Sequence, residues 1–285
     1  MIEVGKTNTF PISKIVDFGV FVDAGNGDEL LIPRKHAPKD ANEGDEVTVF
    51  VYLDSEDRPI ATTQKPKVEV GQFAYLKVTD VTRVGAFVDW GLDKELLVPY
   101  GEQHRPMEVG ERYLVYVYLD DLDQRPTASS KIDKFVKDEN EGTFKPEQQV
   151  DLIIANSTDL GYKAIINHSH WGLLFKQDVF QRLSFGQTKK GFVKQIRPDD
   201  RINLSLQGGQ VTRDKYSKII MEFLKKEGGV AAVHDKSKPE VISKLFGMSK
   251  AAFKKAIGGL YKSGDIVIEK TGIRLVEKES GDEQE

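Results

Sequence analysis

Phe-Gly-Val-Phe-Val-Asp at residues 18–23 returns as Val-Gly-Ala-Phe-Val-Asp at residues 84–89, and this pair of stretches decides the fold. The similarity extends on both sides, so that residues 4–63 recur as residues 70–130. A repeat of this length is a whole small domain rather than one unit of a solenoid. The sequence therefore predicts an array of similar domains, an arrangement suited to holding an extended partner.

Each copy consists of short alternating segments rich in Val, Ile, Phe and Tyr, separated by turn residues such as those at 26–28. Residues 47–53 and 113–119 are the clearest of these segments, and the alternation is typical of strands with one buried face. About five such segments per copy predict a small five-stranded barrel. Gly19 and Gly85 lie within strands, where glycine commonly marks a bulge or a tight bend.

A third, divergent copy follows at about residues 144–206. Leu-Gly-Tyr-Lys-Ala-Ile at 160–165 takes the glycine-centred position, and Trp-Gly-Leu-Leu-Phe at 171–175 corresponds to the Glu-Leu-Leu segment of the first copies. Arg-Ile-Asn-Leu-Ser-Leu at 201–206 closes the copy. The charged stretch 131–142, which separates the second and third copies, is expected to be a linker.

The hydrophobic period becomes helical from about Thr212. Pro239 is expected to open a second, short helix, and Ser249 is a good N-cap for a third. Two short strands are expected at 266–268 and 273–276. Three helices followed by a hairpin predict a winged helix-turn-helix.

The sequence thus predicts a multidomain protein: three all-β five-stranded barrels followed by an α+β winged helix. The expected segments are a first barrel at 1–64, a second at 65–135, a third at 143–208, the winged helix at 211–277 and an acidic tail at 278–285.

The composition is that of an ordinary globular chain, with 30% charged and 39% hydrophobic residues among 285. The absence of cysteine excludes disulfides and thiolate metal sites and is consistent with a reducing compartment. No signal peptide and no apolar run long enough to span a bilayer are evident. We expect a cytoplasmic protein without a membrane partner.

Charge is distributed unevenly along the chain. Residues 1–64 hold 6 Lys and Arg against 12 Asp and Glu, whereas residues 209–276 hold 14 against 7. The intervening segments are close to neutral: 65–135 hold 10 basic residues against 12 acidic ones, and 136–208 hold 10 against 9. A polyanion would therefore meet the C-terminal half more readily than the N-terminal half.

The barrel copies resemble the S1-type OB-fold RNA-binding domain. The strand at 18–23 matches its Phe-Gly-Ala-Phe-Val element, and 201–205 matches its closing Gly-Arg-Ile-x-Leu-Ser element from the arginine onward. Three such barrels followed by a winged helix resemble the bacterial conserved virulence factor B family of RNA-binding regulators. The resemblance covers nearly the whole chain and implies binding of single-stranded RNA.

This resemblance also implies an RNA-binding face made of two Phe, a His, an Asp and an Arg. Carried over by position, the first copy has Ile32 at the His position, and the second copy has Val84 and Val98 in place of the first Phe and the His. The third copy has Leu160 and Lys163 at the Phe positions, Phe175 at the His position, and Arg197 and Arg201 at the Asp and Arg positions. The candidate RNA-binding residues in the barrels are Phe18, Phe21, Arg58, Phe87, Arg125, Tyr162, Lys163, Phe175, Arg197 and Arg201.

Aromatic side chains on a sheet can stack on exposed bases, and neighbouring Lys or Arg can neutralise phosphate. For Phe18 and Phe21, burial in the barrel core is an alternative of equal weight to RNA binding. The arginines could simply cover barrel edges. In the winged helix, Lys250, Lys254 and Lys255 cluster at the start of the expected recognition helix. A solvated helix face is the alternative for these lysines.

No credible active site is evident, and we expect neither an enzyme nor a cofactor. His168 and His170 could share one strand face, but a third metal ligand is lacking nearby, so a turn is the simpler interpretation. The pairs Asp120-Asp121 and Asp199-Asp200 suit turns rather than a metal-dependent nuclease.

Our leading interpretation is a non-enzymatic protein that binds single-stranded RNA and affects post-transcriptional gene expression, with most binding by the third barrel and the winged helix. One alternative is a DNA-binding transcription regulator led by the winged helix. Another is a scaffold whose acidic first two barrels bind a basic protein partner, such as a ribosomal protein or a ribonuclease. The sequence leaves the oligomeric state and the RNA target open.

Overall fold

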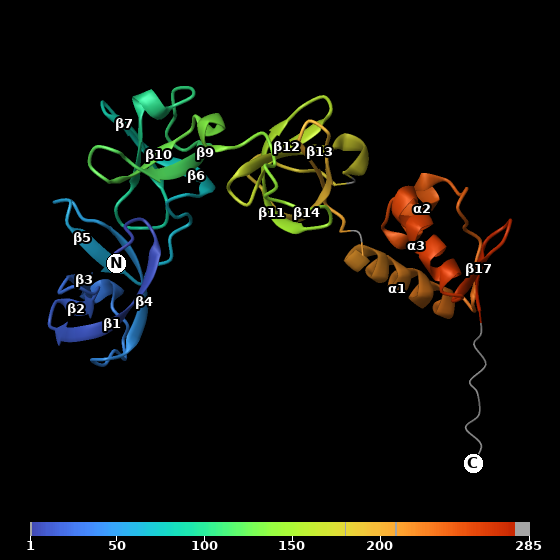
Figure 1. The fold of residues 1–285 in the computed structure, drawn as a ribbon, viewed down its shortest axis with the longest axis horizontal. Helices are drawn as coiled ribbons and strands as arrows, with labels where there is room; N and C mark the ends of the chain where they lie inside the picture. Colours follow the sequence, from blue (N-terminus) through green and yellow to red (C-terminus); the bar gives the residue numbers. More distant parts are fainter. Residues whose placement is uncertain (1, 180, 209, 277–285) are drawn as a thin grey trace, which may run out of the picture.

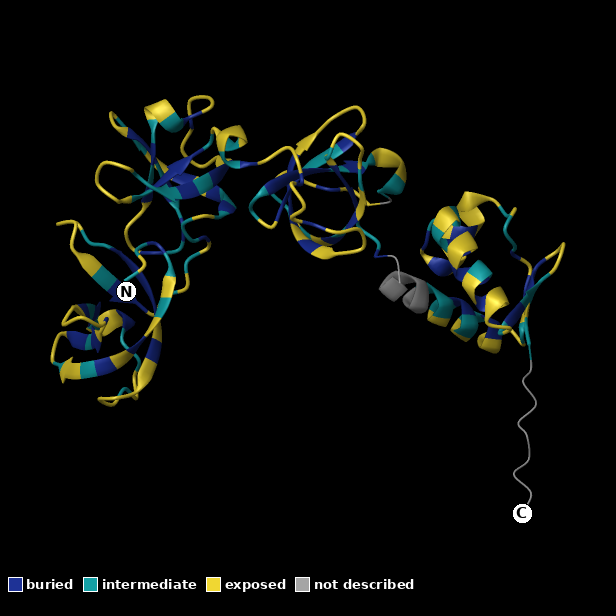
Figure 2. Ribbon diagram, in the orientation of Figure 1, coloured by how far each residue is buried: buried dark blue, intermediate teal, exposed yellow. Residues whose placement is uncertain are grey.

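The computed structural model of the chain describes residues 2–179, 181–208 and 210–276. Three β-units follow one another along the chain and lead into a helical unit that contains α1, α2 and α3 (Figure 1). Buried residues concentrate inside each unit (Figure 2). The acidic tail expected at 278–285 lies outside the described residues.

The first barrel is a five-stranded sheet with the strand order β3-β2-β1-β4-β5. Its strands are β1 (Thr7–Val16), β2 (Gly19–Asp23), β3 (Glu29–Pro33), β4 (Glu46–Leu53) and β5 (Pro59–Thr62), with a 3-10 turn η1 (Arg34–His36) after β3. Alternation places Val20, Val22 and Ile32 in its core.

The second barrel repeats this arrangement with the order β10-β9-β6-β7-β8. Its strands are β6 (Phe73–Thr82), β7 (Gly85–Asp89), β8 (Leu96–Pro99), β9 (Arg112–Leu119) and β10 (Pro126–Ser129), with η2 (Tyr100–Glu102) after β8. In both barrels the first strand carries a register shift at the same place, between Ile12 and Lys14 in β1 and between Val78 and Asp80 in β6. The repeat in sequence is therefore a repeat in detailed backbone geometry.

The third barrel is closed, because β13 pairs in parallel with β15. Its strands are β11 (Gln149–Ser157), β12 (Gly161–Ile166), β13 (His170–Phe175), β14 (Thr188–Ile196) and β15 (Ile202–Ser205), with η4 (Lys176–Asp178) after β13. The same register shift recurs in β11, between Ile154 and Asn156. The divergent third copy thus keeps the fold of the first two.

A glycine begins the second strand of each barrel because the facing strand approaches too closely for a side chain. A Cβ atom at Gly19 would lie 2.2 Å from the carbonyl oxygen of Ile32, and one at Gly161 would lie 2.0 Å from that of Leu174. The repeated glycine in the sequence therefore reports a close backbone contact.

The first two barrels share a core at their junction. Phe50 and Tyr52 of β4 belong to the hydrophobic cluster of the second barrel, and the Phe50 ring meets Trp90 edge-on with centroids 5.5 Å apart. Asp93 of the second barrel is bonded to Lys35 and to His36 Nε2 of the first. The hydrogen bond from Lys35, followed by that of His36, lowers the pKa of Asp93 to about 2.

The second and third barrels are joined by a separate apolar cluster. Phe73 of β6 and Trp171 of β13 are buried in it, together with Val136. Residues Ile132–Phe135 form a 3-10 turn, η3, and Phe135 stacks on Tyr116 with centroids 4.2 Å apart. The expectation of a simple linker at 131–142 was therefore wrong: apolar residues within this charged stretch pack between the barrels.

The C-terminal unit is a winged helix. Its elements are α1 (Gln210–Lys226), β16 (Val230–Ala231), α2 (Pro239–Phe246), α3 (Lys250–Lys262), β17 (Ile266–Ile268) and β18 (Ile273–Leu275). Gly247 ends α2 in the left-handed conformation, and Ser249 caps α3 by accepting a hydrogen bond from the Ala252 N–H. The wing has one more strand than the sequence suggested, since β16 pairs with β18.

Candidate nucleic-acid interface

The first barrel presents an aromatic pair on its outer face. Phe18 is 61% exposed, and its ring meets that of Phe21 edge-on with centroids 6.1 Å apart. Of the two roles weighed from the sequence, the structure places Phe18 on the surface and Phe21 half-buried beside it. The pair could stack on a base, but the barrel around it is the most acidic part of the described chain.

Arg58 of the first barrel is bound to carboxylates. Its guanidinium donates two hydrogen bonds to Asp54 Oδ2 and also lies 2.8 Å from Glu56 Oε2. The backbone N–H of Arg58, followed by its side chain, lowers the pKa of Asp54, so this carboxylate stays ionised. A phosphate approaching Arg58 would have to compete with two negative charges.

In the second barrel, the predicted residues offer little aromatic surface or unpaired charge that could contact nucleic acid. Phe87 is half-buried, and Val84, which stands where the first barrel has Phe18, is 53% exposed. Arg125 is ion-paired with Asp57 of the first barrel and with Asp123. Arg125 therefore joins two barrels, and its charge is compensated.

The strand ladders define which residues are equivalent in the three barrels. Gly161 pairs with Phe175, just as Gly19 pairs with Pro33. Phe175 therefore corresponds to Pro33, whereas Ile32 and Val98 lie in the fully buried row. Placing Ile32 and Val98 at the family's His position was wrong by one residue, because a shift of one turns a strand side chain to the opposite face.

The third barrel carries basic residues where the first carries Phe and Asp. Lys163 occupies the ladder position of Phe21, since each faces a leucine of the next strand, Leu173 or Leu31. The Lys163 ammonium lies 3.9 Å from the centroid of the Trp171 ring, a cation–π contact. Tyr162 and Phe175 are half-buried nearby along β12 and β13.

Lys163, Arg197 and Arg201 line one cavity of about 420 Å³ in this barrel. Arg197 is paired with Asp199 at 2.9 Å, whereas Arg201 is exposed and has no carboxylate partner among the described residues. The other lining residues are Asp138, Thr158, Asp159, Leu160, Trp171, Gly172, Leu173, Ile202 and Asn203. The structure thus brings three of the predicted residues together into one site.

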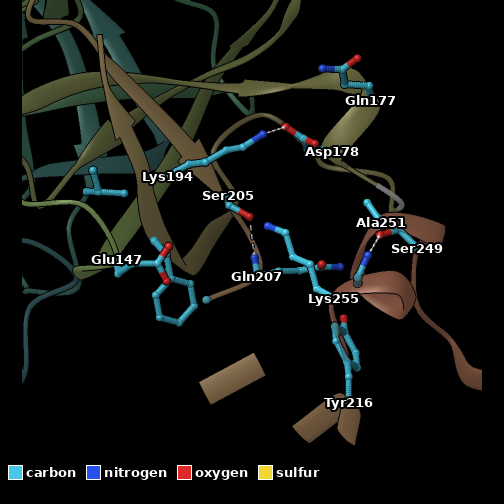
Figure 3. A pocket seen from close by; sticks show the side chains of 14 residues that line it. Glu147, Gln177, Asp178, Lys194, Ser205, Gln207, Tyr216, Ser249, Ala251 and Lys255 are labelled. Carbon is cyan, nitrogen blue, oxygen red and sulfur yellow. Dashed lines mark hydrogen bonds and ion pairs between the residues drawn. The ribbon is translucent and has the colours of Figure 1, made fainter. Parts of the chain in front are cut away.

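The predicted lysines of the winged helix lie on the first two turns of α3. Lys254 and Lys255 are exposed and unpaired within the described chain, and Lys250 Nζ donates to the carbonyl of Lys236 at 3.3 Å. Lys255 reaches toward Gln207 and Ser205 in a pocket between α3 and the third barrel (Figure 3). The same pocket is lined by Lys194, which is paired with Asp178.

The histidines at 168 and 170 serve packing. His168 has a left-handed backbone in the turn before β13, and its Nδ1 accepts a hydrogen bond from the Phe73 N–H of the second barrel at 3.0 Å. His170 is buried against Phe144. In the described residues no group of three or more His, Asp or Glu side chains could hold a metal ion.

Two residues of the cavity escaped the sequence reasoning. Trp171 was noted only as a marker of the repeat, although a Trp beside a basic strand is a usable signal. Asn203 stands inside the closing motif, and its burial depends on the parallel pairing of β15 with β13, which no local pattern reveals.

Comparisons with known proteins agree with this architecture. The S1 domain family matches residues 4–64 and 70–131, and the CvfB-like winged helix domain family matches residues 218–275. No helix in the described parts of the chain is long and apolar enough to cross a membrane.

Relatives match along most of the chain. The Bacillus subtilis (strain 168) protein YitL is 30% identical over 278 residues, which cover 92% of this chain and 90% of that protein. Conserved virulence factor B of Staphylococcus saprophyticus is 28% identical over 274 residues, covering 89% and 88%. A solved multidomain protein with nucleic acid binding domains from Streptococcus pneumoniae is 24% identical over 96% of this chain and 98% of that one, with a TM-score of 0.40.

The predicted fold, OB barrels of the S1 type followed by a winged helix, is confirmed by these matches and by the strand pairing. Both are folds that commonly bind nucleic acid. On the domain matches and the near full-length similarity, the chain belongs to the conserved virulence factor B family.

Proposed function

We propose that this protein binds single-stranded RNA, and that the third barrel and the winged helix supply most of the binding free energy. One observation carries the proposal. Lys163, Arg197 and Arg201 line one cavity of the third barrel, and Arg201 has no carboxylate partner among the described residues, whereas its equivalents in the first two barrels, Arg58 and Arg125, are bound to carboxylates.

Electrostatics supports this division of labour. Binding to nucleic acid depends on cations that are free to neutralise phosphate, because the release of counterions supplies much of the affinity. Arg201, Lys254 and Lys255 are exposed without carboxylate partners in the described residues. By contrast, the first barrel carries twice as many acidic as basic residues.

Regulation of bound transcripts is the functional consequence that we propose. A chain that holds extended RNA by stacking and phosphate contacts alters access to that RNA without catalysis. We found no candidate catalytic constellation in the described residues, and we propose no enzymatic role.

The test is the affinity of the full-length protein for single-stranded RNA, single-stranded DNA and duplexes of matched length, measured by fluorescence anisotropy over a series of salt concentrations. We expect the tightest binding to single-stranded RNA, with a salt slope of about −0.7 for each neutralised phosphate. Tighter binding to duplex DNA would favour the transcription-regulator alternative. Binding to none of the three, together with a protein that co-purifies after nuclease treatment, would favour the scaffold alternative.

A further inference from the structure

We propose that the cavity of the third barrel is a base-reading subsite, in which Asn203 accepts a hydrogen bond from the exocyclic amino group of adenine or cytosine. This inference rests on the proposed binding of single-stranded RNA and specifies what one part of the site recognises. The amino-bearing bases share a donor at the position where uracil and guanine present a carbonyl oxygen.

The observation behind the proposal is an unpaired acceptor. Asn203 is 9% exposed, and its Oδ1 atom is fully buried without a hydrogen-bond partner in the described structure. Buried polar atoms in folded proteins are nearly always hydrogen-bonded, so this oxygen calls for a partner that the described residues do not supply. Asn203 lines the cavity, so a rotation of its side-chain amide toward the cavity would let an entering N–H donor satisfy this oxygen.

The shape of the cavity suits one nucleotide. Its volume of about 420 Å³ lies within the range typical of small-ligand sites. Gly172 and Ile202 contribute to the wall, and Leu160 is a 67% exposed apolar residue of the same lining. A base inserted here would leave water and contact apolar surface.

Hydrogen bonding rather than stacking on Trp171 would select the base. The indole is 6% exposed, and the Lys163 ammonium already lies 3.9 Å from its centroid. A base can therefore meet only a small part of this ring. Recognition must therefore come from polar groups. Among the lining residues, Asn203 is the one whose side chain is buried, polar and uncharged.

The charges at the cavity suit the phosphate of the same nucleotide. Arg201 is free of carboxylate partners in the described residues, while Lys163 lies 3.7 Å from Asp133. Asp138 and Asp159 also line the cavity, so the positive charge is local rather than general. Arg201 is the best-placed residue to bind phosphate while the base reaches Asn203.

The other two barrels lack this subsite. Asn203 pairs with Gln195 on β14, as Ile60 pairs with Tyr52 and Thr127 with Tyr118. Ile60 has no polar side-chain atom, and the Thr127 hydroxyl donates to the carbonyl of Arg125. Base reading of this kind is therefore confined to the third barrel.

Two matched RNAs test the proposal on the full-length protein: decacytidylate and decauridylate, which differ in the amino and carbonyl groups of the base. We expect decacytidylate to bind about fivefold to tenfold more tightly, the effect of one added hydrogen bond. Asn203→Leu, which keeps the volume but removes the amide, is expected to abolish this preference by weakening decacytidylate alone. Thr127→Val, at the equivalent position of the second barrel, should leave the preference unchanged.

The outcomes separate the subsite from the function on which it rests. If the unmodified protein binds the two RNAs equally, the subsite is overturned while RNA binding stands. If it binds neither, the proposed function itself is overturned. A preference that survives in a folded Asn203→Leu variant, checked by its thermal unfolding, would also overturn the role of Asn203.

Discussion

The first and third barrels place different chemistry on the same framework. Both have a bulge in the first strand and a glycine at the start of the second. Yet the ladder position that holds Phe21 in the first barrel holds Lys163 in the third. The backbone contacts that define the fold are shared, and the exposed rows between them are free to differ.

A second pair of positions shows the same exchange. Asp54 and Arg58 bond to each other through the turn before β5, and Arg197 and Arg201 occupy the same turn in the third barrel. Replacing the acid with a second arginine leaves Arg201 without its carboxylate partner. The comparison teaches that the barrels differ in the availability of a charge rather than in the presence of an arginine, and this difference is the basis of the proposed division of binding between them.

The largest effect should come from a change in the shared framework. Gly161→Ala and Gly19→Ala would each place a methyl group against a backbone carbonyl, and we expect each to lower the free energy of unfolding by about 3 kcal/mol. Urea denaturation followed by circular dichroism measures this. Gly101→Ala is the control, because nothing lies within 4 Å of its Cβ position, and it should change stability little.

The next effect concerns the free arginine. Arg201→Glu is expected to weaken binding of single-stranded RNA about tenfold at low salt and to reduce the salt slope, because it removes one cation and adds repulsion. Arg58→Glu, at the equivalent position of the first barrel, should change affinity less than about twofold. Equal losses in the two variants would erase the proposed difference between the barrels.

The aromatic side chains should separate the barrels more weakly. Phe175→Ala is expected to cost about 1 kcal/mol of RNA-binding free energy through lost stacking. Phe18→Ala removes a ring that is already exposed, so stability should stay unchanged, and the acidic surroundings should keep its effect on affinity smaller. Anisotropy with the same RNA measures both, and a larger loss for Phe18→Ala would place the main stacking surface on the first barrel.

The smallest effect concerns pH and the junction of the second and third barrels. Burial lowers the pKa of His168 and, with Lys137, that of His170, so both histidines bind protons less readily in the folded protein than an exposed imidazole does. Their unfolded forms bind protons more readily, and stability should therefore fall as the pH drops below about 6.5. At the junction of the first and second barrels, by contrast, the pKa of the Asp93 carboxyl is lowered to about 2, so this carboxylate stays ionised over the same pH range.

Thermal unfolding at pH 7.5 and pH 5.5 measures this dependence. His168→Gln retains a polar side chain but does not titrate, so it should reduce the loss of stability at the lower pH. An unchanged pH dependence in this variant would mean that other groups control it.

The sequence predicted the fold well because its signals are local or repeated. Alternation identified the strands, and the Ser249 cap with Gly247 marked the turn between α2 and α3. The stretch 131–142 misled because its charged residues outnumber the few apolar ones that pack. The assignment of Ile32 and Val98 to the RNA-binding face was wrong because the face on which a strand residue lies depends on the strand register. Only the pairing of the strands reveals that register.

The sequence by itself determined the repeat, the barrel class, the winged helix and the charge gradient, since each depends on residue types and their spacing. Only the tertiary structure decided which candidate residues are free to bind. Arg125 is neutralised by Asp57, 68 residues away in the chain, and the Asn203 acceptor becomes buried only when β15 closes the barrel. The physical reason is that desolvation and ion pairing depend on neighbours in space, and a spacing in sequence records those only within one strand or turn.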